Sequence, residues 1–223
     1  MRIGRLWQFA VLAAIVLGTP GVGVNGMEKS KIDIPKGWSG IVTYGTLMFK
    51  PFMERCLGRK CPGQVYRVHL AGFIRGWEFR RPLSDPASDP APPQEISATR
   101  RTEQAEAPVE GLISLNVYPE KGARLNGVLY ILSDADLLKV DEIESGYRRL
   151  DVTDKIEEYD FAGGKVYVYE GLPEDGAVKA ADPARFVLMK EYLDRVVRAA
   201  DAIGGEFRAE YDETTRPIAY RVV

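Results

Sequence analysis

The stretch from Gly40 to Leu47 constrains the fold of this chain more than any other. Its run from Ile41 to Tyr44 is rich in β-branched and aromatic side chains and favours an extended, half-buried strand. Gly45 follows at once, and it permits a sharp turn and the close approach of another group to bare backbone. Successive amide N–H groups in such a turn can converge on an anion or a developing oxyanion. A strand followed by glycine is also an ordinary structural turn, so this stretch alone leaves both interpretations open.

Composition predicts one globular domain with an appendage. The 223 residues suffice to bury one sizeable core, and 45% of them are hydrophobic. Lys and Arg (30) nearly balance Asp and Glu (32), and the net charge is -2. This balance argues against a protein that binds nucleic acid by neutralising phosphates.

Residues 1–26 have the pattern of a secretory signal or N-terminal anchor. A start with two arginines precedes a mostly apolar run that ends at Leu17, and small residues follow. Because the run is short for a membrane span, we expect export to the periplasm or the extracellular space. The tail has no Ala-x-Ala cleavage signature, so an uncleaved anchor is one alternative. A translation start at Met27 is another, and it would leave a cytoplasmic protein.

Cysteine and histidine are too few to indicate a metal site or a nucleophilic triad. Cys56 and Cys61 would form a disulfide in an exported protein or remain free thiols in a reducing compartment. Together with one histidine they cannot easily provide a metal site. That histidine, His69, lies beside Arg67 on the polar face of an expected strand. A surface or hydrogen-bonding role is therefore favoured over a catalytic base, and the sequence predicts neither metal nor cofactor.

Hydrophobic periodicity predicts alternating strands and helices. Residues 82–108 are rich in Pro, Ala, Ser and acidic residues, so we expect a mobile insertion there, either a surface loop or a flap. Helices are predicted at 48–61, at 134–144 with Ser133 as N-cap, and from Asp182-Pro183 to the stop at Gly204-Gly205. The further expected strands are 65–70, 74–80, 111–117, 127–132, 147–152 and 165–170, with an edge strand at 218–223.

Glu144 is a carboxylate whose predicted position suits a catalytic acid/base. On a helical projection it shares the face of Leu137 and Val140, at spacings of seven and four residues, and so is predicted to point inward. Burial and the helix C-terminus both raise the pKa of such a carboxyl, toward the range that a general acid/base needs near neutral pH. The alternative is a frayed last turn with Glu144 in solvent and paired with Arg148 or Arg149.

In their order and spacing, these pieces resemble the γ-glutamylcyclotransferase-like superfamily. The resemblance spans roughly residues 40–205 and implies an α+β fold, a small mixed β-barrel with flanking helices, within a domain at 27–223. The segments that carry it are Val42–Leu47, Val68–Phe73, Gly127–Leu132, Val140–Arg149, Val166–Tyr169 and Tyr192-Leu193.

The resemblance also implies a reaction and a site. Members release 5-oxoproline from γ-glutamyl peptides, γ-glutamyl amines or glutathione, without metal or organic cofactor. The γ-glutamyl group is held by backbone amides of a turn, and the catalytic glutamate lies three residues after an aspartate and shortly before a tyrosine. The expected partner is thus a small γ-glutamyl substrate. The positions implied here are Glu144 as the catalytic residue and Tyr44, Gly45, Thr46, Leu47 and Tyr147 as the substrate-binding residues.

Two other functions remain open at this stage. The first is a barrel without catalytic activity that binds a γ-glutamyl or peptide-like ligand. The second is an amide hydrolase in which Glu144 activates a water molecule. No nucleic-acid partner is expected, and no membrane contact beyond a possible N-terminal anchor. The sequence indicates no oligomeric state.

Overall fold

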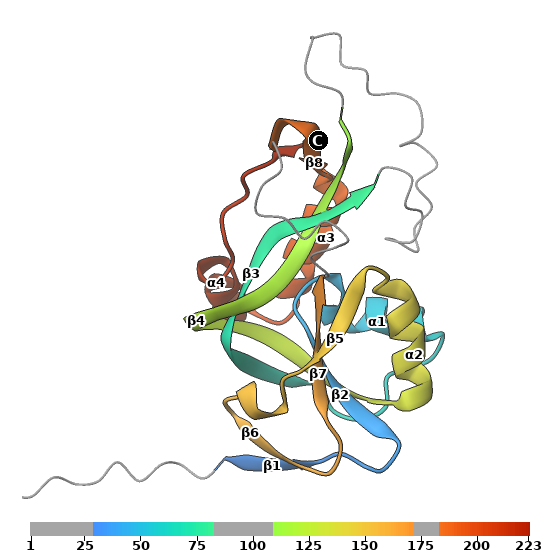
Figure 1. Cartoon of the computed structure of the whole chain (residues 1–223). Helices are drawn as coiled ribbons and strands as arrows, with labels where there is room; N and C mark the ends of the chain where they lie inside the picture. The colour runs from blue at the N-terminus through green and yellow to red at the C-terminus, as the bar shows by residue number, and fades with distance from the viewer. Residues whose placement is uncertain (1–28, 83–108, 172–182) are drawn as a thin grey trace, which may run out of the picture.

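A computed structural model describes residues 29–82, 109–171 and 183–223 of the chain (Figure 1). The predicted N-terminal signal lies outside these ranges, and so does the predicted insertion except for Pro82. Within the described ranges, none of the helices has the length and apolar character that a membrane crossing requires.

Two long antiparallel strands form the centre of the fold. Strand β3 (Tyr66–Pro82) includes both strands predicted at 65–70 and 74–80, and β4 (Gly111–Ser133) includes those at 111–117 and 127–132. The break that the sequence indicated at residues 71–73 coincides with a shift in the register of the β3–β4 pairing, and a second shift lies between Gly76 and Phe79. This irregularity bends the pair without ending it, so β3 and β4 run together across the molecule (Figure 1).

The remaining strands extend this pair into a seven-stranded mixed sheet. Its order is β5-β7-β2-β4-β8-β9, with β3 beside β4, and the described pairing ends at β5 and β9. A separate parallel pair joins β1 to β6. The bounds are β1 Ser30–Asp33, β2 Trp38–Thr43, β5 Tyr147–Asp151, β6 Tyr159–Ala162, β7 Val166–Gly171, β8 Phe186–Leu188 and β9 Arg221–Val222.

Helices flank this sheet, so the predicted α+β class is confirmed (Figure 1). Helix α2 begins as predicted, since the Ser133 hydroxyl accepts a hydrogen bond from the Asp136 amide at 3.2 Å. Its buried residues Leu137 and Val140 face the core. The bounds are α1 Lys50–Leu57, α2 Asp134–Ile143, α3 Lys190–Asp201 and α4 Gly205–Glu213, with short 3-10 turns at η1 Thr46–Met48, η3 Thr153–Lys155 and η4 Pro183–Arg185.

The helix predicted from Asp182 is wrong at its start. Residues 183–185 form η4, and the apolar run at 186–188 forms β8, which pairs in parallel with β4 and β9. These three apolar residues are all buried, and a short continuous apolar run is typical of a buried strand. The helix itself, α3, begins after Met189 and keeps the predicted stripe, with Val196 and Ala200 fully buried. Asp182 lies outside the described residues.

Helix α4 was not predicted, because Gly204-Gly205 was interpreted only as a stop. It is anchored by Arg75 of β3, which is fully buried. The guanidinium donates to the Tyr211 carbonyl at 3.2 Å and to the hydroxyls of Thr214 and Thr215 at 2.7 and 2.6 Å. A cation at a helix C-terminus is favourable there. Arg75 thus ties α4 to the central strands.

Gly146 closes the turn between α2 and β5, and its backbone is in the left-handed region at φ +85. A Cβ atom there would lie 2.9 Å from the Phe79 Cζ atom. Gly37 has a similar φ of +80 but open space around it. A substitution at either glycine would therefore strain the backbone to a similar degree. Only at Gly146 would the new side chain also overlap with Phe79.

We predict that Gly146→Ala lowers the free energy of unfolding by roughly 1–3 kcal/mol more than Gly37→Ala does. Left-handed backbone strain costs each variant about 1–2 kcal/mol. The overlap with Phe79 adds an overpacking cost of roughly 1–3 kcal/mol to Gly146→Ala only. Urea unfolding followed by circular dichroism measures both. Equal losses in the two variants would contradict the packing of this turn against Phe79.

Candidate active site

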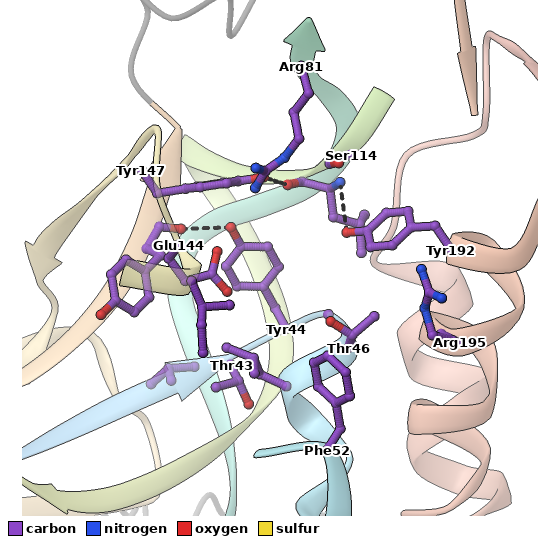
Figure 2. A pocket seen from close by; sticks show the side chains of 16 residues that line it. Thr43, Tyr44, Thr46, Phe52, Arg81, Ser114, Glu144, Tyr147, Tyr192 and Arg195 are labelled. Carbon is purple, nitrogen blue, oxygen red and sulfur yellow. Dashed lines mark hydrogen bonds between the residues drawn. The ribbon is translucent and has the colours of Figure 1, made fainter. Parts of the chain in front are cut away.

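One pocket brings together every site residue that was named from the sequence. It measures about 710 Å³ with its open mouth included, and it lies between the end of β2, the end of α2, and α3 (Figure 2). The predicted residues that line it are Tyr44, Gly45, Thr46, Leu47, Glu144 and Tyr147. Segments about 100 residues apart therefore face the same space.

The first wall is the turn that follows β2. The Met48 amide donates to the Gly45 carbonyl at 3.0 Å, and the Phe49 amide donates to the Thr46 carbonyl at 3.1 Å. The first N–H groups of a helical turn have no partner within that turn. The amides of residues 45–47 come before Met48, the first donor of η1, so they make none of its hydrogen bonds. Gly45 and Thr46 are half-buried, and both line the pocket. The amides of this wall are thus not used by the hydrogen bonds within η1.

Tyrosine hydroxyl groups hold this turn in place from within the core. The Tyr44 hydroxyl donates to the Tyr169 carbonyl at 2.7 Å, and the Tyr44 carbonyl accepts from the Tyr211 hydroxyl of α4 at 2.8 Å. The Tyr130 hydroxyl donates to the Met48 carbonyl at 3.0 Å. Three different elements thus fix the backbone on either side of Gly45, so the amide positions are set before a ligand arrives.

Glu144 forms the opposite wall. It is the C-cap of α2, where its amide donates to the Val140 carbonyl at 2.9 Å. Its carboxylate lies beside the Tyr44 ring (Figure 2). Burial raises the pKa of this carboxyl to about 7, although the nearby Arg81 charge opposes the rise. A carboxyl with this pKa can both accept and release a proton near neutral pH.

The solvent-exposed alternative for Glu144 depended on Arg148 or Arg149 as its partner. In the structure Arg148 pairs with Glu170 at 2.9 Å, and Arg149 pairs with Asp141 at 3.2 Å. Asp141 also accepts from the Tyr169 hydroxyl at 2.7 Å. These charges are therefore engaged beside β5 and β7, while the Glu144 side chain lines the pocket.

Aromatic residues close the site around the carboxyl. The Tyr147 hydroxyl donates to the Leu115 carbonyl at 2.6 Å, and the Tyr192 hydroxyl accepts from the Leu115 amide at 3.3 Å. Burial raises the pKa of Tyr192 to about 12 and that of Tyr147 well above its usual value. Both side chains are hence neutral near pH 7. Of these three side chains, Glu144 is the one whose pKa lies near neutral pH.

The sequence did not single out the remaining polar residues of the pocket. Arg81 was missed because the predicted strand ended at Arg80, next to the predicted insertion. Arg195 of α3 carried a usable signal, since it lies three residues after Tyr192 and so shares its helix face. The lining residues missed in this way are Arg81, Ser114, Tyr169 and Arg195.

His69 lies outside this pocket and has the hydrogen-bonding environment that was favoured for it. Its Nε2 atom is 2.7 Å from a Glu210 carboxylate oxygen, and its Nδ1 atom contacts Glu158. Ligand atoms of His69, Glu157 and Glu158 lie within 4.8 Å of one another, but Glu157 already pairs with Arg124 at 2.8 Å. This cluster is separate from the groups that surround Glu144.

The cysteines are also separate from the pocket. Cys56 is half-buried in α1, Cys61 is buried, and the two are not joined in a disulfide. Burial raises the pKa of the Cys61 thiol, so the thiol form predominates at neutral pH. Of the two states considered from the sequence, the structure has the one without a disulfide.

Comparison with known proteins identifies the fold. No protein-family model matches the chain, and no curated protein matches it significantly. YkqA from Bacillus subtilis is similar in structure with a TM-score of 0.51 and 17% identity, over 80% of this chain and 54% of that one. This chain therefore spans about half the length of YkqA, and the likeness shows a shared fold.

Further solved structures match less closely. A protein described as gamma-glutamyl cyclotransferase has a TM-score of 0.43 and 15% identity, over 83% of this chain and 94% of that one. A yeast gamma-glutamyl cyclotransferase specific to glutathione has a TM-score of 0.39 and 12% identity, over 80% of this chain and 87% of that one. The fold itself is shown by the likeness to YkqA.

We predict that Glu144→Gln removes one pH dependence from the stability of the fold. Because the pKa of Glu144 is about 7 in the folded chain and 4.5 in a free carboxyl, the unfolded chain loses this proton first as pH rises. Wild-type stability therefore falls between pH 4.5 and 7 and levels off above. Glutamine does not ionise, so the variant lacks this loss. The free energy of unfolding of Glu144→Gln minus that of the wild-type protein should therefore increase from pH 4.5 to pH 7. Urea unfolding at a series of pH values measures the difference, and a constant difference would contradict the raised pKa.

Proposed function

We propose that this chain acts, as well as folds, like a γ-glutamylcyclotransferase and releases 5-oxoproline from a small γ-glutamyl compound. The observation that carries the proposal is the pocket that Glu144, with its raised pKa, lines together with Gly45, Thr46 and Leu47 of the β2 turn. Among the described residues that line it, none is histidine or cysteine. This set of groups suits a reaction in which the substrate supplies its own nucleophile.

A γ-glutamyl compound carries that nucleophile in its α-amine. The amine nitrogen attacks the γ-carbonyl carbon and closes a five-membered ring. As the new C–N bond forms, the Glu144 carboxylate accepts the proton that the attacking nitrogen loses. As the original amide bond breaks, Glu144 delivers this proton to the leaving nitrogen. The products are 5-oxoproline and a free amine, and Glu144 returns to its carboxylate form. One group whose pKa is about 7 is suited to both transfers.

The turn after β2 contributes binding and orientation. Its amides can hold the substrate α-carboxylate or the oxyanion that develops on the γ-carbonyl oxygen. Holding the substrate folded brings amine and carbonyl together, and such intramolecular geometry can remove up to about 7–11 kcal/mol of the barrier. Proton transfer through Glu144 then contributes roughly 10²–10⁴-fold in rate. In this proposal, orientation supplies the larger share of the catalysis.

We predict that Glu144→Gln folds normally and loses 5-oxoproline release by about 10²–10⁴-fold, because the amide side chain cannot carry the proton. Glu142→Gln is the matched control, since Glu142 is exposed on the same helix and does not line the pocket. It should retain wild-type turnover. The measurement is 5-oxoproline release from γ-glutamyl dipeptides, γ-glutamyl amines and glutathione, quantified by mass spectrometry.

The product distinguishes this proposal from the two other functions. Free glutamate in place of 5-oxoproline would indicate an amide hydrolase. Calorimetric binding of γ-glutamyl compounds without any product would indicate a non-catalytic barrel. Full turnover by Glu144→Gln would remove Glu144 from the mechanism and refute the assignment of the site.

A further inference from the structure

The peptide group that joins Tyr44 to Gly45 differs from its two successors in how its carbonyl is held. The next two carbonyls of the β2 turn accept from the Met48 and Phe49 amides at 3.0 and 3.1 Å. The Tyr44 carbonyl instead accepts from a side chain, the Tyr211 hydroxyl of α4, at 2.8 Å. Tyr211 thus extends the hydrogen-bond pattern of the turn by one peptide group.

This contact sets the direction of the Gly45 N–H. No cis peptide bond occurs in the described ranges, so the Tyr44 carbonyl and the Gly45 N–H, which share one peptide group, point in opposite directions. Because the carbonyl points at Tyr211, the N–H points away from α4. Tyr44 and Gly45 line the pocket, and Tyr211 is not among the lining residues.

The Gly45 N–H is also unused. None of the hydrogen bonds among the described residues has it as donor. Gly45 has no side chain to cover the peptide group, and an added Cβ atom would lie 3.9 Å from the Tyr192 hydroxyl oxygen of the same pocket. A half-buried N–H without an acceptor, in a residue that lines a pocket, is suited to a ligand oxygen.

Tyr211 is held firmly enough to fix this arrangement. It is buried, and the Arg75 guanidinium carbon lies 3.4 Å from the centroid of its ring. The same guanidinium donates to the Tyr211 carbonyl at 3.2 Å, so one cation contacts both the side chain and the backbone of this residue. Burial raises the pKa of the Tyr211 hydroxyl, and the Arg75 charge opposes the rise. The hydroxyl therefore keeps its proton, while the cation on its ring strengthens it as a donor.

We propose that Tyr211 is a positioning residue of this site, which aims and polarises the Tyr44–Gly45 peptide group so that the Gly45 N–H donates to an anionic oxygen of the ligand. The inference rests on the proposed function. A hydrogen bond accepted by a carbonyl makes the N–H of the same peptide group a stronger donor. The anionic oxygen belongs either to the α-carboxylate of the γ-glutamyl group or to the oxyanion on its γ-carbonyl. Helix α4 thereby acts on the reaction through one backbone donor.

Tyr211→Phe tests the proposal, because it deletes the hydroxyl and keeps the ring against Arg75. The variant should fold and lose 5-oxoproline release by about 10- to 100-fold, less than the roughly 10²–10³-fold that removal of an oxyanion donor itself costs. The loss falls on kcat if the Gly45 N–H holds the oxyanion. It falls on KM if that N–H holds the carboxylate.

Tyr130→Phe is the matched comparison. Tyr130 is also buried, and its hydroxyl donates to the Met48 carbonyl of the same turn at 3.0 Å. The N–H of that peptide group belongs to Phe49 and already donates to the Thr46 carbonyl. Both variants lose one buried hydroxyl and should unfold at similar urea concentrations, yet Tyr130→Phe should lose several-fold less turnover. Equal losses of turnover would reduce Tyr211 to a structural role and overturn the inference.

A second measurement needs no turnover. The amide resonances of Glu144→Gln, with and without Tyr211→Phe, are followed by NMR while γ-glutamyl-alanine is added. The Gly45 amide proton should move downfield as the compound binds, and this shift should be smaller without the Tyr211 hydroxyl. A Gly45 resonance that does not respond, or a shift that is equal in both proteins, would overturn the inference. If wild-type protein releases no 5-oxoproline while the Gly45 resonance still responds in this way, the proposed function has failed and the role of Tyr211 stands.

Discussion

The burial of one ionisable carboxyl at the end of α2 is the constraint on which the site depends. Desolvation of Glu144 raises its pKa to about 7, and this costs stability wherever the folded chain must ionise it. The buried stripe of Leu137 and Val140 fixes the helix that carries it, and the left-handed Gly146 turns the chain directly into β5. A carboxyl that titrates near neutral pH is thus held at a set place, at a cost in stability that the rest of the core offsets.

The opposite wall depends on support from elements far along the chain. Tyr211 of α4 donates to the Tyr44 carbonyl, and Arg75 of β3 holds the C-terminal end of that helix through the Tyr211 carbonyl. Arg75 is fully buried, and because burial disfavours its charged form, its pKa is lowered to about 10. The β2 turn is therefore positioned from behind by a polar network. Gly45, Thr46 and Leu47 of this turn line the pocket.

Much of this arrangement was predictable from local sequence, and the remainder depends on contacts between distant residues. The Ser133 cap, the inward face of α2 and the edge strand at the C-terminus follow from capping, periodicity and apolar alternation. The strand at 186–188 and helix α4 do not, because their formation depends on pairing with β4 and on Arg75. Arg81 escaped notice for the same kind of reason: only the continuous β3 brings it over Tyr147. The export signal and the insertion beyond Pro82 remain predictions.

The central claim is that the Glu144 carboxyl and the β2 turn act on the same ligand within one pocket. A crystal structure of the Glu144→Gln variant with a bound γ-glutamyl dipeptide tests it most directly. The account predicts that the γ-glutamyl group lies between the two walls, with its carboxylate or γ-carbonyl oxygen accepting from amides of residues 45–47. The scissile amide nitrogen should then lie within hydrogen-bonding distance of the substituted side chain at position 144. A dipeptide bound outside this pocket, or a side chain at position 144 turned away from it, would contradict the account.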